Sequence, residues 1–99
     1  AFCANLLHES QQDLANLFAG RAGGAHAERF DRAGWAAGTL GQPLLTGATA
    51  AFECQIATAL LWETHYIILG RVGAVHLSDD PAALLYGQRA YRRAVGLEG

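Results

Sequence analysis

The side chain best placed to do chemistry in this sequence is a histidine. His65 opens the most apolar run of the chain and directly follows Glu63 and Thr64. At the mouth of a β-barrel, where ligand sites commonly lie, such a histidine can donate a hydrogen bond to a bound molecule. The same position also suits a histidine that bonds only to its neighbours at the end of a strand. The residues around His65 leave both interpretations open.

Arginine-rich groups are the next candidates, because guanidinium groups bind phosphate through paired hydrogen bonds. One group is Tyr91, Arg92 and Arg93 near the end of the chain, where arginines also often protect the edge of a sheet. The other lies in a glycine-rich stretch and consists of Arg21, Arg29 and Arg32. Either group could meet an anionic ligand or simply face water.

Motifs of other chemistries are absent from the sequence. It contains no GxSxG, HExxH, P-loop or GxGxxG motif. The four histidines, at positions 8, 26, 65 and 76, do not have the spacing of metal ligands, so no metal site is expected. Asp79 and Asp80 are adjacent carboxylates, but they precede Pro81 in a turn-like segment, which favours a solvated turn over acid–base catalysis.

Length and composition indicate one folded domain. The 99 residues are 52% apolar and only 16% charged, so the chain can bury a core. This apolar share is high for such a short chain, and we expect apolar surface that a second subunit or further chain covers. The net charge of −2 argues against nucleic acid as a partner, since phosphate binding needs clustered cations.

The two cysteines and the lengths of the apolar runs indicate where in the cell the protein is located. Cys3 and Cys54 do not form a CxxC pair; one disulfide is an alternative, but buried thiols are the favoured interpretation. Free thiols fit the reducing cytoplasm, which we therefore expect as the location. No run has the length of a membrane span, and no signal peptide pattern is visible.

A few helices and strands must position these candidate residues, and the sequence pattern predicts the first two of them directly. Residues 2–7 read as a short buried strand, and residues 10–19 as a helix. Ser10 and Asp13 suit the start of this helix as cap and first-turn carboxylate, and Gly20 suits its left-handed end. One apolar stripe has helical spacing: Leu14, Leu17 and Phe18.

Residues 20–43 show no sustained period and are rich in Gly, Ala and Arg. We predict a long surface excursion here, with one short helical turn at residues 25–30. A loop of this length in a compact domain is usually functional or a lid.

From Gly47 onward the apolar period changes to two. Phe52, Cys54 and Ile56 alternate with Glu53 and Gln55, which predicts a strand with one face in water. Residues 64–77 are apolar on both faces and predict a second long strand in a central position. Residues 84–92 predict a closing hairpin around Gly87 and Gln88. One helix followed by antiparallel strands indicates a mainly β, α+β fold, a small Greek-key barrel or part of one.

The order of these features is more specific than any one of them. The chain runs from Phe2-Cys3-Ala4-Asn5-Leu6-Leu7 through Gln11 and Asp13-Leu14-Ala15 to Phe18-Ala19-Gly20. This succession resembles the F-x-x-N-x-L…Q-x-x-L-A-x-x-F-A-G stretch of the flavin reductase-like, FMN-binding split-barrel family. Later stretches also follow the family in order and spacing: Glu28-Arg29-Phe30, Trp35, Gly38, Gln42-Pro43-Leu44-Leu45, Gly47-Ala48, Phe52-Glu53-Cys54, Thr64-His65, Ile68-Leu69-Gly70-Arg71-Val72, Leu84-Leu85-Tyr86 and Tyr91-Arg92.

The resemblance covers nearly the whole chain and is strongest to reductase components of two-component monooxygenases, of the 4-hydroxyphenylacetate 3-monooxygenase type. It implies an antiparallel Greek-key split β-barrel with one principal helix, forming a homodimer. It also implies an NAD(P)H-dependent flavin reductase that binds FMN or FAD, takes hydride from NADH or NADPH, and supplies reduced flavin to a partner oxygenase. Neither choice of cofactor follows from the sequence.

The resemblance also assigns residues. His65 matches the family's histidine near the nicotinamide and flavin, and is the expected catalytic residue. Asn5 would lie on the strand beside the flavin, and Tyr91 beside its ring system. Three further residues would border the dinucleotide site: Phe18, Arg29 and Phe30.

Two departures from the family pattern stand out. The family's glycine before the Asp/Thr-His pair is Glu63 here, so the turn beside His65 is expected to differ. The family's N-terminal part, which contributes to the flavin site, is also missing from these 99 residues. We therefore expect residues 1–99 to be the C-terminal part of a single domain, and the barrel to be partial. The alternative is a flavin-binding or structural fragment without catalysis.

Overall fold

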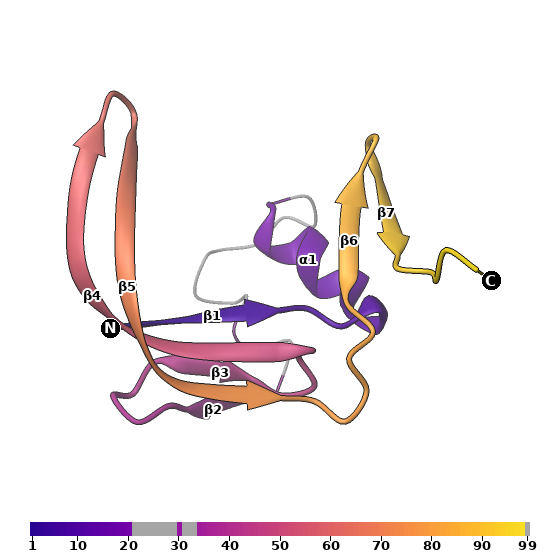
Figure 1. Cartoon of the computed structure of the whole chain (residues 1–99), viewed down its shortest axis with the longest axis horizontal. Helices are drawn as coiled ribbons and strands as arrows, with labels where there is room; N and C mark the ends of the chain where they lie inside the picture. Colours follow the sequence, from indigo (N-terminus) through magenta and orange to yellow (C-terminus); the bar gives the residue numbers. More distant parts are fainter. Residues whose placement is uncertain (21–29, 31–33, 99) are drawn as a thin grey trace.

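The computed structural model describes residues 1–20, 30 and 34–98. This part of the chain is mainly β, with one short α-helix (Figure 1). The elements follow in the order β1 (Phe2–Leu6), the 3-10 helix η1 (Glu9–Gln11), α1 (Gln12–Phe18), β2 (Trp35–Ala37), β3 (Pro43–Leu45), β4 (Ala50–Trp62), β5 (His65–Leu77), β6 (Leu84–Gly87) and β7 (Ala90–Arg93).

The helical segment begins with η1 at Glu9, and its cap lies two residues earlier than predicted. His8, rather than Ser10, is the cap: its ring Nδ1 accepts from the backbone N–H of Ser10 at 3.1 Å. The side chain of Gln11 completes a capping box by accepting from the backbone N–H of His8 at 2.8 Å. Ser10 therefore lies inside η1, and the prediction of Ser10 as cap was wrong. Gly20 has φ +80, which confirms the predicted left-handed end of the helix.

The three longest strands form one antiparallel sheet in the order β1-β4-β5. Asn5 lies opposite Ala51, and Phe52 lies opposite Val75. The central strand is thus β4, and within the described residues β5 pairs with β4 alone. The prediction that residues 64–77 form the central strand was wrong, because β5 lies at the edge of the sheet in the described part of the chain. Most of its side chains are exposed.

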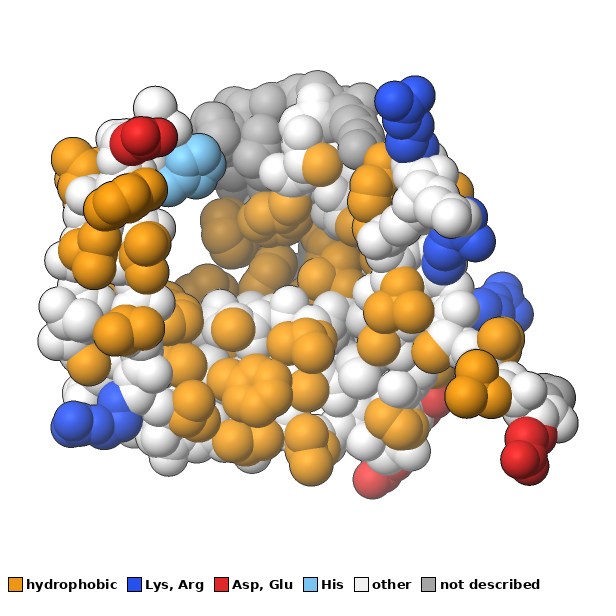
Figure 2. Space-filling model, turned by 45° about the horizontal axis from the view of Figure 1, so that its top comes forward, with side chains coloured by type: hydrophobic (Ala, Val, Ile, Leu, Met, Phe, Trp, Pro, Cys, Tyr) orange, Lys and Arg blue, Asp and Glu red, His pale blue; other side chains and the backbone are white. Residues whose placement is uncertain are grey.

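The outer half of the β4–β5 hairpin, residues 56–72, projects from the sheet as an arm (Figure 1). Figure 2 shows hydrophobic side chains gathered on this arm, and a hollow between the arm and the rest of the molecule. Large apolar side chains here are roughly half exposed: Ile56, Leu60, Leu61, Trp62, Tyr66, Ile67, Ile68, Leu69 and Val72. The expected excess of apolar surface is therefore present, and it is concentrated on one element.

The segment predicted as a loop contains a second, smaller sheet. β2 and β3 pair antiparallel, with Trp35 opposite Leu45, in a two-stranded sheet of their own. Each strand has only three residues, too few to show a period in the sequence. The helical turn predicted at residues 25–30 lies outside the described residues except for Phe30.

The closing hairpin predicted from residues 84–92 is confirmed as β6 and β7. Its two-residue turn is Gln88-Arg89, with φ +52 and +64, so both residues adopt the left-handed conformation of a type I′ turn. This hairpin packs beside η1 and α1, because Tyr91 donates from its hydroxyl to Asn16 Oδ1 at 2.9 Å.

The buried core lies between α1 and the β2–β3 hairpin. Leu14, Leu17 and Leu45 form its buried cluster, and Leu7, Trp35 and Ala48 pack against it. The predicted helical stripe is confirmed for Leu14 and Leu17, whereas Phe18 at its end is 37% exposed.

Gly70 allows the start of β1 to lie close against the arm. A Cβ atom at this position would lie 2.5 Å from Phe2 Cζ and 3.2 Å from Cys54 Cβ. Gly70→Ala is therefore expected to lower the free energy of unfolding by about 1–3 kcal/mol, because the Phe2 ring must move out of its contact. Urea denaturation measures this loss. The matched change Gly87→Ala, where a Cβ meets no atom within 4 Å, should cost much less.

Candidate functional site

An aromatic cavity of about 370 Å³ lies beside the end of α1. Three aromatic rings form one wall: the Phe18 and Phe30 centroids are 5.3 Å apart, those of Phe30 and Trp35 5.0 Å, and those of Phe18 and Trp35 5.9 Å. The other lining residues are Cys3, Asn5, Leu7, Leu14, Ala15, Pro43 and Leu45. This volume is within the range of small-molecule sites, and flat aromatic walls suit a planar ring system.

Local structure explains why these rings meet. Phe18 is the last residue of α1, and Trp35 is the first residue of β2. Trp35 Nε1 is buried and has no hydrogen-bond partner in the described part of the chain. Buried indole N–H groups are normally paired, so this donor is an exception among the described residues.

Asn5 lines this cavity and is held by the backbone of β3. Its Nδ2 donates to the carbonyl of Pro43 at 3.1 Å, and its Oδ1 accepts from the N–H of Leu45 at 3.1 Å. The side-chain amide thus pairs with β3 as another strand would. The nearby thiol of Cys3 approaches the same Oδ1 at 3.5 Å. Burial is the largest cause that raises the pKa of the Cys3 thiol, and the charge of Glu53 adds to it.

A buried carboxylate lies on the same sheet, where the sequence predicted a solvent-facing side chain. Glu53 has an exposed fraction of only 6%. Its Oε2 lies 2.6 Å from His76 Nε2, and its Oε1 accepts from the backbone N–H of Thr39 at 2.6 Å. The prediction that Glu53 faces water was wrong, because the turn between β2 and β3 covers it. Alternation along β4 could not reveal this turn, which is contributed by residues 38–42.

The hydrogen bond from His76, followed by that from Thr39, lowers the pKa of the Glu53 carboxyl below its ordinary value of 4.5. A carboxyl whose pKa falls on folding stabilises the fold above its unfolded pKa, and this contribution is lost as the pH falls through the folded pKa. The free energy of unfolding should therefore decline as the pH drops below about 4.5. Urea titrations between roughly pH 3 and pH 6 should show a flatter profile for Glu53→Gln. Equal slopes for both proteins would contradict this assignment.

His65 lies at the tip of the arm and is the first residue of β5. Its Nδ1 is 2.9 Å from the Thr64 hydroxyl, and its side chain is not among those that line the aromatic cavity. The preceding turn residue Glu63 has φ +55, a conformation that favours glycine. A glycine would fit here without strain, whereas Glu63 adopts this conformation at a conformational cost.

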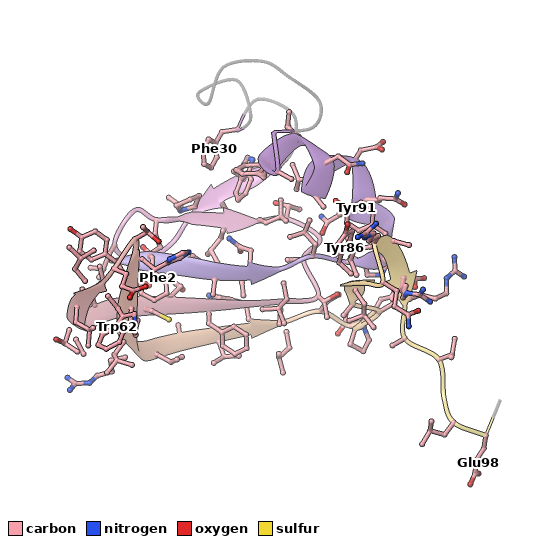
Figure 3. The ribbon with its side chains drawn as sticks, turned by 90° about the horizontal axis from the view of Figure 1, so that it is seen from above. Phe2, Phe30, Trp62, Tyr86, Tyr91 and Glu98 are labelled. Carbon is pink, nitrogen blue, oxygen red and sulfur yellow. The ribbon has the colours of Figure 1, made fainter. Side chains whose placement is uncertain are left out.

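The predicted site residues fall into two groups. Asn5, Phe18 and Phe30 line the aromatic cavity together, whereas His65 and Tyr91 do not. Figure 3 shows Tyr91 beside Tyr86 at the opposite end of the molecule from Trp62, which is the register partner of His65. The Tyr86 and Tyr91 rings are 5.2 Å apart. Arg29 lies outside the described residues.

Sequence reasoning missed the cavity residue Trp35 and the Glu53–His76 pair as candidates. Trp35 was noted only as part of the resemblance, although a tryptophan between glycine-rich segments could have drawn attention to it. Glu53 and its partner His76 are 23 residues apart, and no local pattern connects them.

The described residues form neither a metal-binding cluster nor a helix that could span a membrane. They contain no group of three or more His, Cys, Asp or Glu side chains that could hold a metal ion. None of the helices formed by the described residues is both long enough and apolar enough to cross a bilayer. Cys3 and Cys54 are free thiols, as predicted; Cys54 is buried, whereas Cys3 is only half-buried.

Comparison with known proteins identifies the class that this fold and cavity represent. Residues 1–94 match the model of the flavin reductase-like domain, and the chain belongs to that family. The expected mainly β split-barrel fold with one principal helix is confirmed. The chain also superimposes on BorF, the flavin reductase component of a bacterial two-component tryptophan halogenase, with a TM-score of 0.78 and 35% identity over 92% of this chain and 57% of that one.

Two curated relatives are more specific. The chain is 44% identical over 89 residues to the FMN reductase (NADH) RutF of Stutzerimonas stutzeri (strain A1501), covering 90% of this chain and 50% of that protein. It is 35% identical over 89 residues to the 4-hydroxyphenylacetate 3-monooxygenase reductase component of Klebsiella oxytoca, covering 90% of this chain and 52% of that protein. The chain thus spans about half the length of the curated relatives it matches.

Proposed function

We propose that this protein is an NAD(P)H-dependent flavin reductase that supplies reduced FMN or FAD to a partner monooxygenase. The observation that carries the proposal is the aromatic cavity, in a chain of the flavin reductase-like family, with three of the predicted cofactor residues around it. The relatives named as an NADH-dependent FMN reductase and as a monooxygenase reductase component support the cofactors and the partner.

The residues that line the cavity fit a flavin or nicotinamide ring. Phe18, Phe30 and Trp35 offer aromatic faces for stacking. A bound flavin would supply the hydride-accepting ring, while the protein binds and orients the reactants and excludes water. Tyr91 and Arg29 remain proposed cofactor contacts by their match to the family pattern.

His65 is the proposed catalytic residue. A ring N–H on His65 would donate a hydrogen bond to the flavin as negative charge develops on it during hydride transfer, which lowers the barrier to that transfer. Nε2 suits this role, because it has no partner among the described residues and Nδ1 is already within hydrogen-bond distance of the Thr64 hydroxyl. The proposed location is the cytoplasm, which fits two free thiols.

The exposed arm supports a homodimer. A run of half-exposed apolar side chains on one projecting hairpin is typical of an interface that is covered in the assembled protein. We propose that a second copy packs on the arm. Trp62 lies near the tip of the arm and is 65% exposed. Its fluorescence is therefore a suitable reporter of that contact.

The test is oxidation of NADH, and then NADPH, by the full-length protein with FMN or FAD in excess. Loss of reduced-nicotinamide absorbance that depends on added flavin would establish the reductase and identify the preferred cofactors. Tight retention of flavin without turnover would indicate instead a flavin-binding module of the same fold. A folded protein that shows neither would contradict both assignments.

A further inference from the structure

The wall of the aromatic cavity that contains Trp35 is attached to the protein in an unusual way. β2 and β3 form a sheet of their own, separate from the β1-β4-β5 sheet beneath them. A strand normally joins its neighbours through a ladder of backbone hydrogen bonds. Because the β2–β3 hairpin does not pair with any described strand of the larger sheet, side chains must hold it in position.

One attachment is made at the turn of this hairpin. The Glu53 carboxylate, from β4, accepts from the Thr39 N–H at 2.6 Å and holds His76 Nε2, from β5, at 2.6 Å. The turn lies so close that a Cβ atom on Gly38 would be 2.5 Å from Glu53 Oε1. Hydrogen bonds to a buried carboxylate are stronger than those between neutral groups, so this contact fixes the turn firmly.

The second attachment is made along β3. The Asn5 amide bonds to the backbone of Pro43 and Leu45, and so replaces two rungs of a ladder. A third side chain, Gln11, donates to the carbonyl of Thr46 at 3.1 Å just beyond the strand.

The register of the large sheet explains why these groups lie together. Cys3 is opposite Glu53, Asn5 is opposite Ala51, and Ala51 is in turn opposite His76. Side chains directly opposite one another, and those two residues apart on one strand, point to the same face. Asn5, Glu53 and His76 therefore form a polar seam on one face of the sheet, the face that the hairpin covers.

We propose that Asn5 and Glu53 are positioning residues, which together act as a clasp that holds the β2–β3 hairpin and so keeps Trp35 in the wall of the cavity. His76 orients the Glu53 carboxylate from β5. The inference rests on the proposed function only for the identity of the ligand; the clasp itself is a property of the protein alone. Its consequence is that cofactor affinity depends on residues that lie beneath the hairpin and not only on the aromatic rings.

Amide hydrogen exchange of the full-length protein tests the clasp without any cofactor. Glu53→Ala should speed exchange of the Thr39 amide about tenfold or more, while leaving the Leu45 amide protected. Asn5→Ala should do the reverse. Both variants should shift the indole N–H resonance of Trp35, identified by its loss in Trp35→Phe. The matched control is Asp79→Asn, which removes an exposed carboxylate from the segment after β5 and should change neither amide.

Unchanged protection of Thr39 in Glu53→Ala, or an unmoved Trp35 resonance in both variants, would overturn the proposal. If Glu53→Ala does not fold, Glu53→Gln is measured against the β1–β4 amides of the same sample. Glutamine keeps an acceptor for Thr39 without the charge, so a smaller but selective rise in Thr39 exchange is expected, and no rise overturns the clasp. Flavin titration of the same variants is interpreted separately. If the unmodified protein does not bind flavin, the proposed function is contradicted. The exchange result still tests the clasp in that case.

Discussion

Replacing His65 by Ala is expected to lower kcat for flavin reduction by about 10²–10³-fold, the usual effect of removing one donor to a developing negative charge. The KM for the reduced nicotinamide should rise as well, because the proposed position of His65 is near both cofactors. Flavin binding should change less than kcat, because the proposed hydrogen bond from His65 strengthens as negative charge develops on the flavin. Steady-state kinetics with varied NADH, together with a flavin titration, measures all three quantities.

Two matched variants make this result specific. His65→Gln keeps a hydrogen-bond donor and should recover part of the lost kcat. Thr64→Val removes the hydroxyl that lies 2.9 Å from His65 Nδ1, and should have a smaller effect through the orientation of the ring. A His65→Ala protein with unchanged kcat and KM would show that this histidine only bonds to its neighbours at a strand end.

The second large effect concerns stability. Leu17 has an exposed fraction of 4% and lies in the buried cluster with Leu14 and Leu45, beside the cavity wall. Leu17→Ala should lower the free energy of unfolding by about 2–5 kcal/mol, through lost transfer energy and the space left behind. Because Trp35 packs against this cluster, the aromatic cavity should loosen too, and flavin affinity should fall.

Urea denaturation of Leu17→Ala and a control measures this cost. Leu97→Ala makes the same chemical change at a fully exposed position, and should shift the free energy of unfolding by no more than about 0.5 kcal/mol. Similar values for the two variants would mean that the α1 core is not a major source of stability.

Local sequence signals predicted the elements that are long or sharply bounded. Alternation over residues 52–56 identified β4, and a long run that is apolar on both faces identified β5. The apolar stripe with Gly20 identified the helix and its end. The β6–β7 hairpin was also predicted, although its turn is Gln88-Arg89 rather than the predicted Gly87-Gln88. Such signals are reliable because each depends on residues that are neighbours in the chain. The resemblance to the flavin reductase-like family, built from many short stretches in order, was confirmed by the family model.

At the start of the helix, two capping patterns lie close together in the sequence. Ser10 and Asp13 form a good capping pattern, but His8 and Gln11 form another two residues earlier, and the structure uses that one. A ring nitrogen of histidine accepts a backbone N–H as a hydroxyl does, so the composition of the segment could not distinguish them.

By itself, the sequence determined the fold class, the family, the principal helix and the long strands, because periodicity and order along the chain specify them. The tertiary structure alone decided that β4 is central, that the β2–β3 hairpin exists, and that Glu53 is buried. It also decided that Asn5 reaches Pro43 and Leu45, which are about 40 residues away. These outcomes depend on which distant segments come into contact. A strand of three residues or a single buried carboxylate has no local sequence pattern from which its partner could be predicted.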